Sequence, residues 1–141
     1  LYDRAHTREI AAFGGLGAKL PVYTGIMVLF SMASLGLPGM SGFVSEFMVF
    51  VGSFGQLNKV MVGIAVLGVV LGATYILRMV QRIFLGEFDL SRWGGLTEIN
   101  FRETVSVAPL AVLTVAIGVY PKPLAQLMNA TLENLITLMA R

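Results

Sequence analysis

The sequence contains few charged residues and no cysteine. Asp, Glu, Lys and Arg make up 13% of its 141 residues, whereas a soluble domain carries about 25% charged residues. The absence of cysteine excludes a disulfide framework and any metal site built on thiolate ligands. The formal net charge is only +2 and the basic residues lie beside apolar segments. They therefore indicate membrane topology signals and not a nucleic-acid interface.

The sequence also lacks the motifs of soluble enzymes. It has no glycine-rich phosphate loop followed by Lys, no zinc-ligand spacing and no nucleophile elbow. A single histidine, His6, cannot by itself form a metal or catalytic site, so no cofactor-binding or metal-binding residue is predicted. The first residues include no initiator Met and lack the order of a signal peptide. We expect the chain to be a piece of a longer polypeptide.

Long apolar runs dominate what is present. Hydrophobic residues make up 56% of the chain, and the mean hydropathy is +0.80. Since a membrane-spanning helix needs about 20 apolar residues, the sequence predicts an all-α, polytopic membrane helix bundle without a separate soluble domain. We predict three spans, at about 21–54, 59–85 and 104–120, and an amphipathic surface helix at 124–140. Asn100 and Glu103 have the spacing of a capping box, and Trp93 and Tyr120 suit membrane-interface anchors.

The first apolar segment is interrupted by Gly36-Leu37-Pro38-Gly39. Pro38 lacks a backbone N–H and clashes with the preceding helical turn. The segment is therefore either a hairpin of two short helices or one broken span. With a broken span, the ten Lys and Arg residues divide seven to three between the two sides of the membrane. With a hairpin they divide six to four. The positive-inside rule favours the broken span, with residues 1–20 and 86–103 in the cytoplasm and the C-terminus outside.

Glu46 is the one charged residue between Lys19 and Lys59. A carboxylate in apolar surroundings costs several kcal/mol unless it is paired, hydrated or protonated. Glu46 is therefore the candidate proton relay, and the alternative is a structural carboxylate paired with a cation of a neighbouring helix. Broken helices recur at the ion sites of transporters. Ser34 and Ser41 flank the break and are candidates to bond its freed carbonyls or to hold water.

Arg78 and Arg82 stand four residues apart at the predicted cytoplasmic end of the second span. Their spacing puts them on one helix face. The simplest interpretation is that both side chains reach the membrane surface and anchor the topology. The alternative is an ion pair with a carboxylate of an adjacent subunit.

Several stretches resemble the C-terminal part of a known family. The string Ala33-Ser34-Leu35-Gly36-Leu37-Pro38-Gly39, followed by Ser41-Gly42-Phe43-Val44-Ser45-Glu46-Phe47, is similar to the NuoM family. This family comprises the chain-4-type, antiporter-like membrane subunits of respiratory complex I. The segments 3–8, 14–21 and 97–103 resemble further landmarks, so the resemblance covers nearly the whole chain. Related cation/proton antiporter subunits usually carry Lys where this chain has Glu46.

The resemblance implies a proton-translocating subunit of NADH:quinone oxidoreductase that couples electron transfer to proton export. Glu46 would be its last protonatable residue, at the outer exit. NADH, FMN, iron–sulfur clusters and quinone are expected on other subunits. The expected partners are the other membrane subunits of complex I, the lipid bilayer and protons, and the expected location is a bacterial cytoplasmic membrane. Three alternatives remain: a cation/proton antiporter subunit, a subunit of a proton-pumping membrane hydrogenase or photosynthetic complex, and a structural packing module with an incidental charge.

Overall fold

The computed structural model describes residues 1–139, and over this range the chain forms helices and turns without a strand. The expected all-α class is therefore confirmed. Four elements are short: α1 (Tyr2–Ala5), the 3-10 helix η1 (Ile10–Ala12), α2 (Leu16–Lys19) and α6 (Leu90–Trp93). Five are long: α3 (Pro21–Ser34), α4 (Ser41–Gln56), α5 (Lys59–Phe84), α7 (Phe101–Val119) and α8 (Lys122–Met139).

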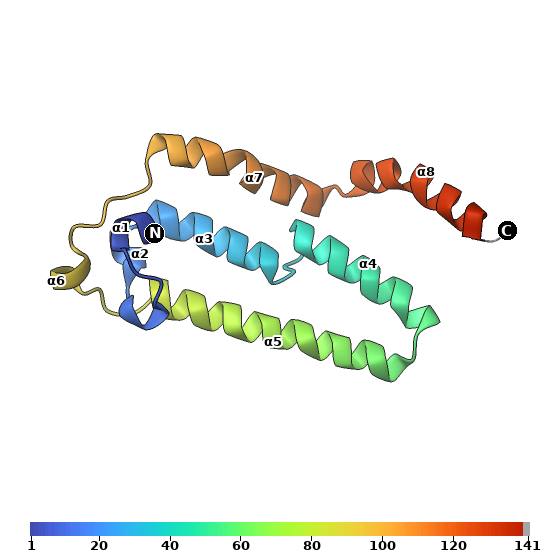
Figure 1. Cartoon of the computed structure of the whole chain (residues 1–141), viewed down its shortest axis with the longest axis horizontal. Helices are drawn as coiled ribbons and strands as arrows, with labels where there is room; N and C mark the ends of the chain where they lie inside the picture. Colours follow the sequence, from blue (N-terminus) through green and yellow to red (C-terminus); the bar gives the residue numbers. More distant parts are fainter. Residues whose placement is uncertain (140–141) are drawn as a thin grey trace.

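The long helices run side by side (Figure 1). α3 and α4 follow one another in the same general direction, and α5 returns beside both of them. α7 lies along the opposite side of the α3–α4 pair and contacts both helices, and α8 continues beyond the end of α7. The short helices and the loop before α7 gather at one end of the molecule. The α3–α4 pair is thus held between α5 and α7.

Side-chain caps explain where α5 and α7 begin. Asn58 precedes α5, and its Oδ1 accepts a hydrogen bond from the Val60 N–H at 3.0 Å. Asn100 and Glu103 form the expected capping box of α7, in which the Asn100 N–H donates to Glu103 Oε2 at 2.7 Å. Because of this cap, α7 begins at Phe101, three residues before the predicted start of the apolar span at 104. Predicted residue 140 of the last helix lies outside the described residues.

Within residues 1–139, two helices are long and apolar enough to cross a membrane. They are α5, with 26 residues, and α7, with 19 residues; the mean hydropathy of the 18-residue apolar window is 2.4 in α5 and 1.5 in α7. α3 is a shorter apolar helix. Only 11% of the apolar window of α5 and none of that of α7 is buried within this chain. Most of their apolar surface is therefore directed away from the described part of the chain.

The hydrophobic core lies at the end where the short helices gather. This loop-end cluster consists of the buried residues Phe13, Leu16, Leu20, Val80, Phe84, Trp93 and Leu96. The rings of Phe13 and Trp93 stack with their centroids 4.9 Å apart, and Trp93 Nε1 donates to the Ala12 carbonyl at 3.0 Å. The expectation that Trp93 is a membrane-interface anchor is wrong, because the loop folds back and buries the indole. Tyr120 is 62% exposed at the end of α7.

Candidate functional site

Residues 35–40 form the break between α3 and α4. Gly36 and Gly39 have φ values of 69° and 93°, which lie in the left-handed region that residues with a Cβ atom rarely adopt. Three turn hydrogen bonds replace part of the lost helical ladder, among them Leu37 N–H to the Met32 carbonyl at 3.2 Å and Met40 N–H to the Leu37 carbonyl at 3.0 Å. The predicted residues Gly36, Leu37, Pro38 and Gly39 therefore all lie in this turn.

Glu46 lies directly against the break. It is in the second turn of α4, and its carboxylate approaches Gly36 so closely that a Cβ atom on Gly36 would overlap Glu46 Oε2. The side chain is half-buried. Within residues 1–139 no cationic side chain forms an ion pair with it. Glu46 is thus in contact with Gly36. The sequence indicated the first residue by its isolated charge and the second by its place in a helix-breaking motif.

A cavity of about 320 Å³ opens beside the carboxylate. Glu46 and Ser34 line it from one side. α5 provides the opposite wall, which is rich in small residues: Ala65, Gly68, Gly72 and Ala73. Since a water molecule occupies about 30 Å³ of liquid volume, the cavity can hold several waters next to the Glu46 carboxylate. Such waters could exchange a proton with it.

The two serines that flank the break differ in position. Ser34 is the last residue of α3 and lines the cavity, whereas Ser41 is the first residue of α4. Neither hydroxyl forms a hydrogen bond to another of the described residues. The hydroxyl that bonds a carbonyl in the first turns of α4 belongs to Ser45, which donates to the Gly42 carbonyl at 2.8 Å. Sequence reasoning singled out Ser34 and Ser41 because they flank Pro38, and this did not identify the hydroxyl that makes the bond.

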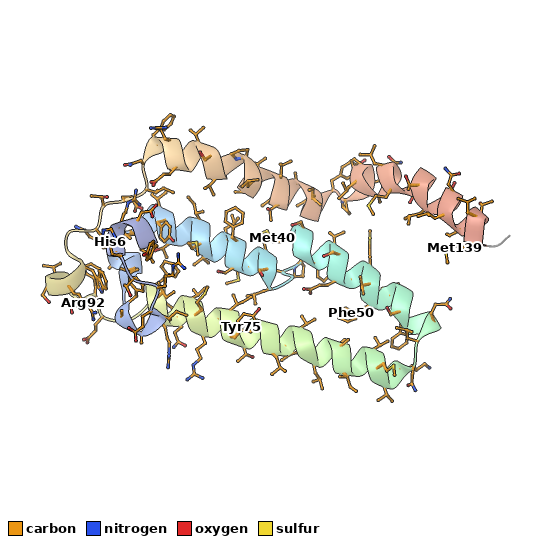
Figure 2. All side chains as sticks on the ribbon, viewed as in Figure 1. His6, Met40, Phe50, Tyr75, Arg92 and Met139 are labelled. Carbon is orange, nitrogen blue, oxygen red and sulfur yellow. The ribbon has the colours of Figure 1, made fainter. Side chains whose placement is uncertain are left out.

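The other side of the break contacts α7. A Cβ atom on Gly118 would overlap the Gly39 carbonyl oxygen and the main chain of Met40. Figure 2 shows Met40 where α4 begins, with the ribbon of α7 above it and that of α5 below. Sequence reasoning missed Gly118. One glycine near the end of an apolar span carries no signal of a contact with residues almost 80 positions earlier.

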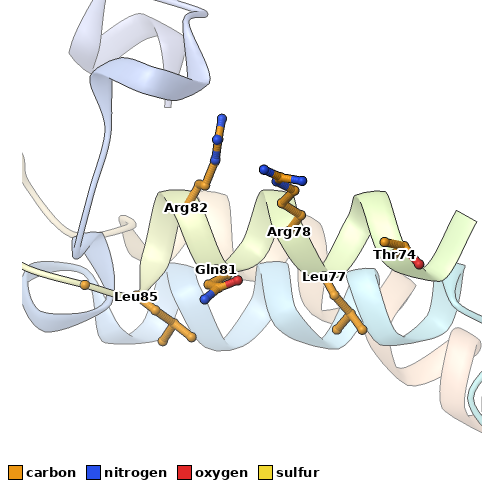
Figure 3. A pocket seen from close by; sticks show the side chains of 7 residues that line it. Thr74, Leu77, Arg78, Gln81, Arg82 and Leu85 are labelled. Atoms are coloured by element: carbon orange, nitrogen blue, oxygen red, sulfur yellow. The ribbon is translucent and has the colours of Figure 1, made fainter. Parts of the chain in front are cut away.

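Arg78 and Arg82 are placed elsewhere. Both are exposed and project from the same side of α5, away from Leu77 and Leu85 (Figure 3). They line an open groove of about 770 Å³ together with Thr74, Leu77, Gln81, Leu85 and Gly86. The Glu46 cavity and this groove share no lining residue. The structure therefore does not bring the two arginines to the candidate relay residue.

Glu98 is a second carboxylate that sequence reasoning passed over. Its oxygens accept hydrogen bonds from the Val22 and Tyr23 N–H groups at 3.1 Å each, and from the Ile99 N–H at 2.9 Å. Burial raises the pKa of Glu98, but these three N–H groups and the nearby Arg4 guanidinium outweigh it, so the pKa lies below its usual range. Glu98 is therefore ionised at neutral pH and caps the N-terminus of α3.

Arg4 links the N-terminal segment to α7. Its Nη2 lies 2.6 Å from Glu103 Oε2, the carboxylate of the capping box. These polar contacts connect three helices. Arg4 belongs to α1, Glu98 binds the first turn of α3, and Glu103 lies in the first turn of α7. Sequence reasoning treated Arg4 as a topology signal only. Its partner stands 99 residues away along the chain.

Known proteins resemble both halves of the chain. The family model described as "NADH:quinone oxidoreductase/Mrp antiporter, TM" matches residues 1–72. NADH-quinone oxidoreductase subunit M of Rhodobacter capsulatus is 40% identical over 136 residues, which make up 96% of this chain and 26% of that protein. NADH-ubiquinone oxidoreductase chain 4 of Marchantia polymorpha is 35% identical over 136 residues, with 96% of this chain and 27% of that protein covered.

A solved structure agrees with these matches. A chain of respiratory complex I from Thermus thermophilus with bound NADH superposes with a TM-score of 0.75 at 30% identity. The match covers 85% of this chain and 25% of that chain. The present chain thus spans about a quarter of the length of the relatives that it matches. The family model covers more than half of the chain, and the relatives cover nearly all of it, so the chain belongs to the NADH:quinone oxidoreductase/Mrp antiporter membrane family, as its motifs indicated.

Proposed function

We propose that this chain is part of a proton-translocating membrane subunit of NADH:quinone oxidoreductase, and that Glu46 carries the proton at the outer end of its path. One observation carries the proposal: the Glu46 carboxylate lies against Gly36 of the helix break and faces a cavity that can hold water. The relatives in Rhodobacter capsulatus and Marchantia polymorpha are named as subunits of NADH oxidoreductases. These names favour this function over that of an independent cation/proton antiporter.

The lengths of the helices support a single broken span for α3 and α4. At about 1.5 Å per residue, the 14 residues of α3 and the 16 residues of α4 extend roughly 21 and 24 Å. Each is shorter than the roughly 30 Å hydrocarbon core of a bilayer. Together, and running in the same direction (Figure 1), they are long enough to cross it. The excess of Lys and Arg in residues 1–20 and 78–103 supports a cytoplasmic position for that end.

In this orientation Glu46 lies in the outer half of the span. α4 continues for ten residues beyond it to Gln56, or roughly 15 Å at 1.5 Å per residue. The carboxylate is thus too deep to reach the surface directly. A proton would leave it through water beside α4.

Reversible protonation of Glu46 is the proposed chemistry. Waters in the cavity beside Glu46 would bring a proton to the carboxylate and take it away. A change in the hydration of the break would therefore open or close this exchange. NADH, flavin, iron–sulfur clusters and quinone would be bound by other subunits of the complex. These would supply the electron transfer that drives the change.

The test is the substitution Glu46→Gln in the full-length complex, reconstituted in proteoliposomes. Gln keeps the size of the side chain but cannot carry a proton, so fewer protons should be exported per electron transferred. Glu87→Gln, which changes an exposed carboxylate in the loop after α5, is the matched control and should leave this ratio unchanged. An unaltered ratio in Glu46→Gln would leave a purely structural carboxylate as the better interpretation.

A further inference from the structure

We propose that Gly118 is a positioning residue for Glu46: its missing side chain lets α7 contact the main chain of the break and thereby fixes the site of the carboxylate. The proposal rests on the proton-carrying role of Glu46. It assigns a part in proton transfer to α7, which contributes no ionisable group near the break.

The first step is the contact itself. A Cβ atom on Gly118 would overlap the carbonyl oxygen of Gly39 and the Cα and carbonyl carbon of Met40. All three are main-chain atoms. A flexible side chain could rotate away from an added methyl group, but a main chain within a turn cannot. An alanine at 118 must therefore push α7 and the break apart.

The second step leads from the contact to Glu46. Met40 is the N-cap residue of α4. Glu46 follows six residues later, less than two helical turns away at 3.6 residues per turn. A helix of this length moves largely as a rigid body, so a displacement of Met40 also displaces the Glu46 side chain.

The third step concerns the position of the Glu46 carboxylate relative to Gly36. Gly36 belongs to the end of the break that follows α3, whereas Met40 belongs to the end that precedes α4. The Glu46 carboxylate rests on Gly36. Pushing Met40 away from α7 therefore changes the position of the carboxylate relative to Gly36. It also changes the cavity that Glu46 shares with Ser34.

Other glycines provide matched controls. An added Cβ atom at Gly52, which is also on α4, or at Gly63 on α5 meets no atom within 4 Å. Both residues are within helices. Gly52→Ala thus adds the same methyl group to the helix that carries Glu46, without contact to the break.

The experiment compares Gly118→Ala, Gly52→Ala and Glu46→Gln in the full-length complex. Two quantities are measured: protons exported per electron, and the carboxyl C=O stretching band in redox-difference infrared spectra that Glu46→Gln removes. Gly118→Ala should lower the proton ratio and displace this band, and Gly52→Ala should change neither. A merely structural role of Gly118 would lower the yield of complex but leave the band in place. A Gly118→Ala complex that matches Gly52→Ala in both measurements would overturn the proposal.

A double variant separates positioning from a general packing defect. If Gly118 acts through Glu46, then Gly118→Ala should have no further effect on the proton ratio in a Glu46→Gln background, because coupled residues are not additive. Independent, multiplied losses would contradict the proposal. If Glu46→Gln alone exports protons normally, the proposed function fails. The displacement of the Glu46 band by Gly118→Ala then still decides whether the contact positions the carboxylate.

Gly39→Ala covers the case in which Gly118→Ala does not assemble. Gly39 has a φ of 93°, and an added Cβ atom there meets no atom within 4 Å. The substitution therefore strains the same turn through its backbone, while the added Cβ atom itself does not contact α7. It should displace the Glu46 band in the same way. An unchanged band and proton ratio in Gly39→Ala would overturn the proposal.

Discussion

The two ends of the α3 helix are held in opposite ways. At its N-terminal end, the loop-end cluster packs large side chains from three separate segments, and Glu98 and Arg4 make polar contacts beside it. At its C-terminal end, the break is held by two close approaches: the Glu46 side chain lies against Gly36, and the main chain of Gly39 and Met40 lies against Gly118. The first end is destabilised when side-chain atoms are removed from the cluster. The second end is destabilised when atoms are added, and Glu46 of α4 lies against it.

The largest expected effect on stability is at the loop-end cluster. Trp93→Ala removes the stacked partner of Phe13 and leaves a cavity, which should lower the free energy of unfolding by about 3–5 kcal/mol. Denaturant unfolding of the full-length subunit in detergent measures it. Tyr120→Ala, at an aromatic residue that is 62% exposed, is the control. Equal losses in the two variants would show that Trp93 is not a core residue.

The break should respond to one added methyl group. Gly36→Ala places a Cβ atom on a residue with a φ of 69° and against the Glu46 carboxylate. Overpacking and backbone strain together should lower the free energy of unfolding by about 1–3 kcal/mol. The same variant should export fewer protons per electron, whereas Trp93→Ala complexes that assemble should not. A loss of stability with a normal proton ratio would show that Gly36 does not contribute to the proposed proton transfer by Glu46.

The cap on α3 should have a smaller effect and depend on pH. Glu98→Ala leaves the Val22 and Tyr23 N–H groups unbonded and should lower the stability of the α3 N-terminus by roughly 1 kcal/mol, as for other caps. Because the pKa of Glu98 is lowered in the folded state, its stabilisation is complete above the ordinary value of about 4.3. It disappears as the pH falls through the lower, folded-state value.

Hydrogen exchange of the Val22 and Tyr23 amides measures this effect. Protection should decrease in Glu98→Ala and, in the wild type, at acidic pH. Glu87→Ala, at an exposed carboxylate in the loop between α5 and α6, serves as the control. Equal protection in the Glu98 and Glu87 variants would contradict the capping role.

The smallest expected effect concerns the ion pair. Arg4 and Glu103 are 21% and 49% exposed in their side chains, and exposed pairs contribute about 0–1 kcal/mol. Arg4→Ala should therefore change stability by less than 1 kcal/mol, and the difference should shrink as salt is added. Arg102→Ala, at an exposed arginine in the first turn of α7, is the comparison. A loss above 2 kcal/mol that is independent of salt would indicate a buried network instead.

Local chemistry explains what the sequence could predict. Pro38 with Gly36 and Gly39 marks a break because proline lacks an N–H and glycine tolerates a positive φ. Asn100 and Glu103 mark a helix start because their side chains bond backbone groups within one turn. Glu46 stands out because nothing nearby in the sequence neutralises it. Each of these signals is contained within a few residues of chain.

Contacts between distant segments could not be predicted in this way. Glu98 and Val22 are 76 residues apart, and no spacing rule links a carboxylate to backbone N–H groups at such a separation. Trp93 misled the prediction because an aromatic residue in a polar stretch gives the same signal at a membrane surface and in a folded loop. The role of Gly118 depends on which helix it faces. That information is contained in the fold and not in the local sequence.

The Glu98 cap has a consequence for biosynthesis. The donors at Val22 and Tyr23 are translated some 76 residues before the carboxylate that accepts from them. Until Glu98 has been translated, the first turn of α3 therefore lacks these acceptors. Its N-terminus reaches its final state only when the segment before α7 has left the ribosome and folded back. We expect the start of the first apolar segment to be among the last parts of this chain to mature.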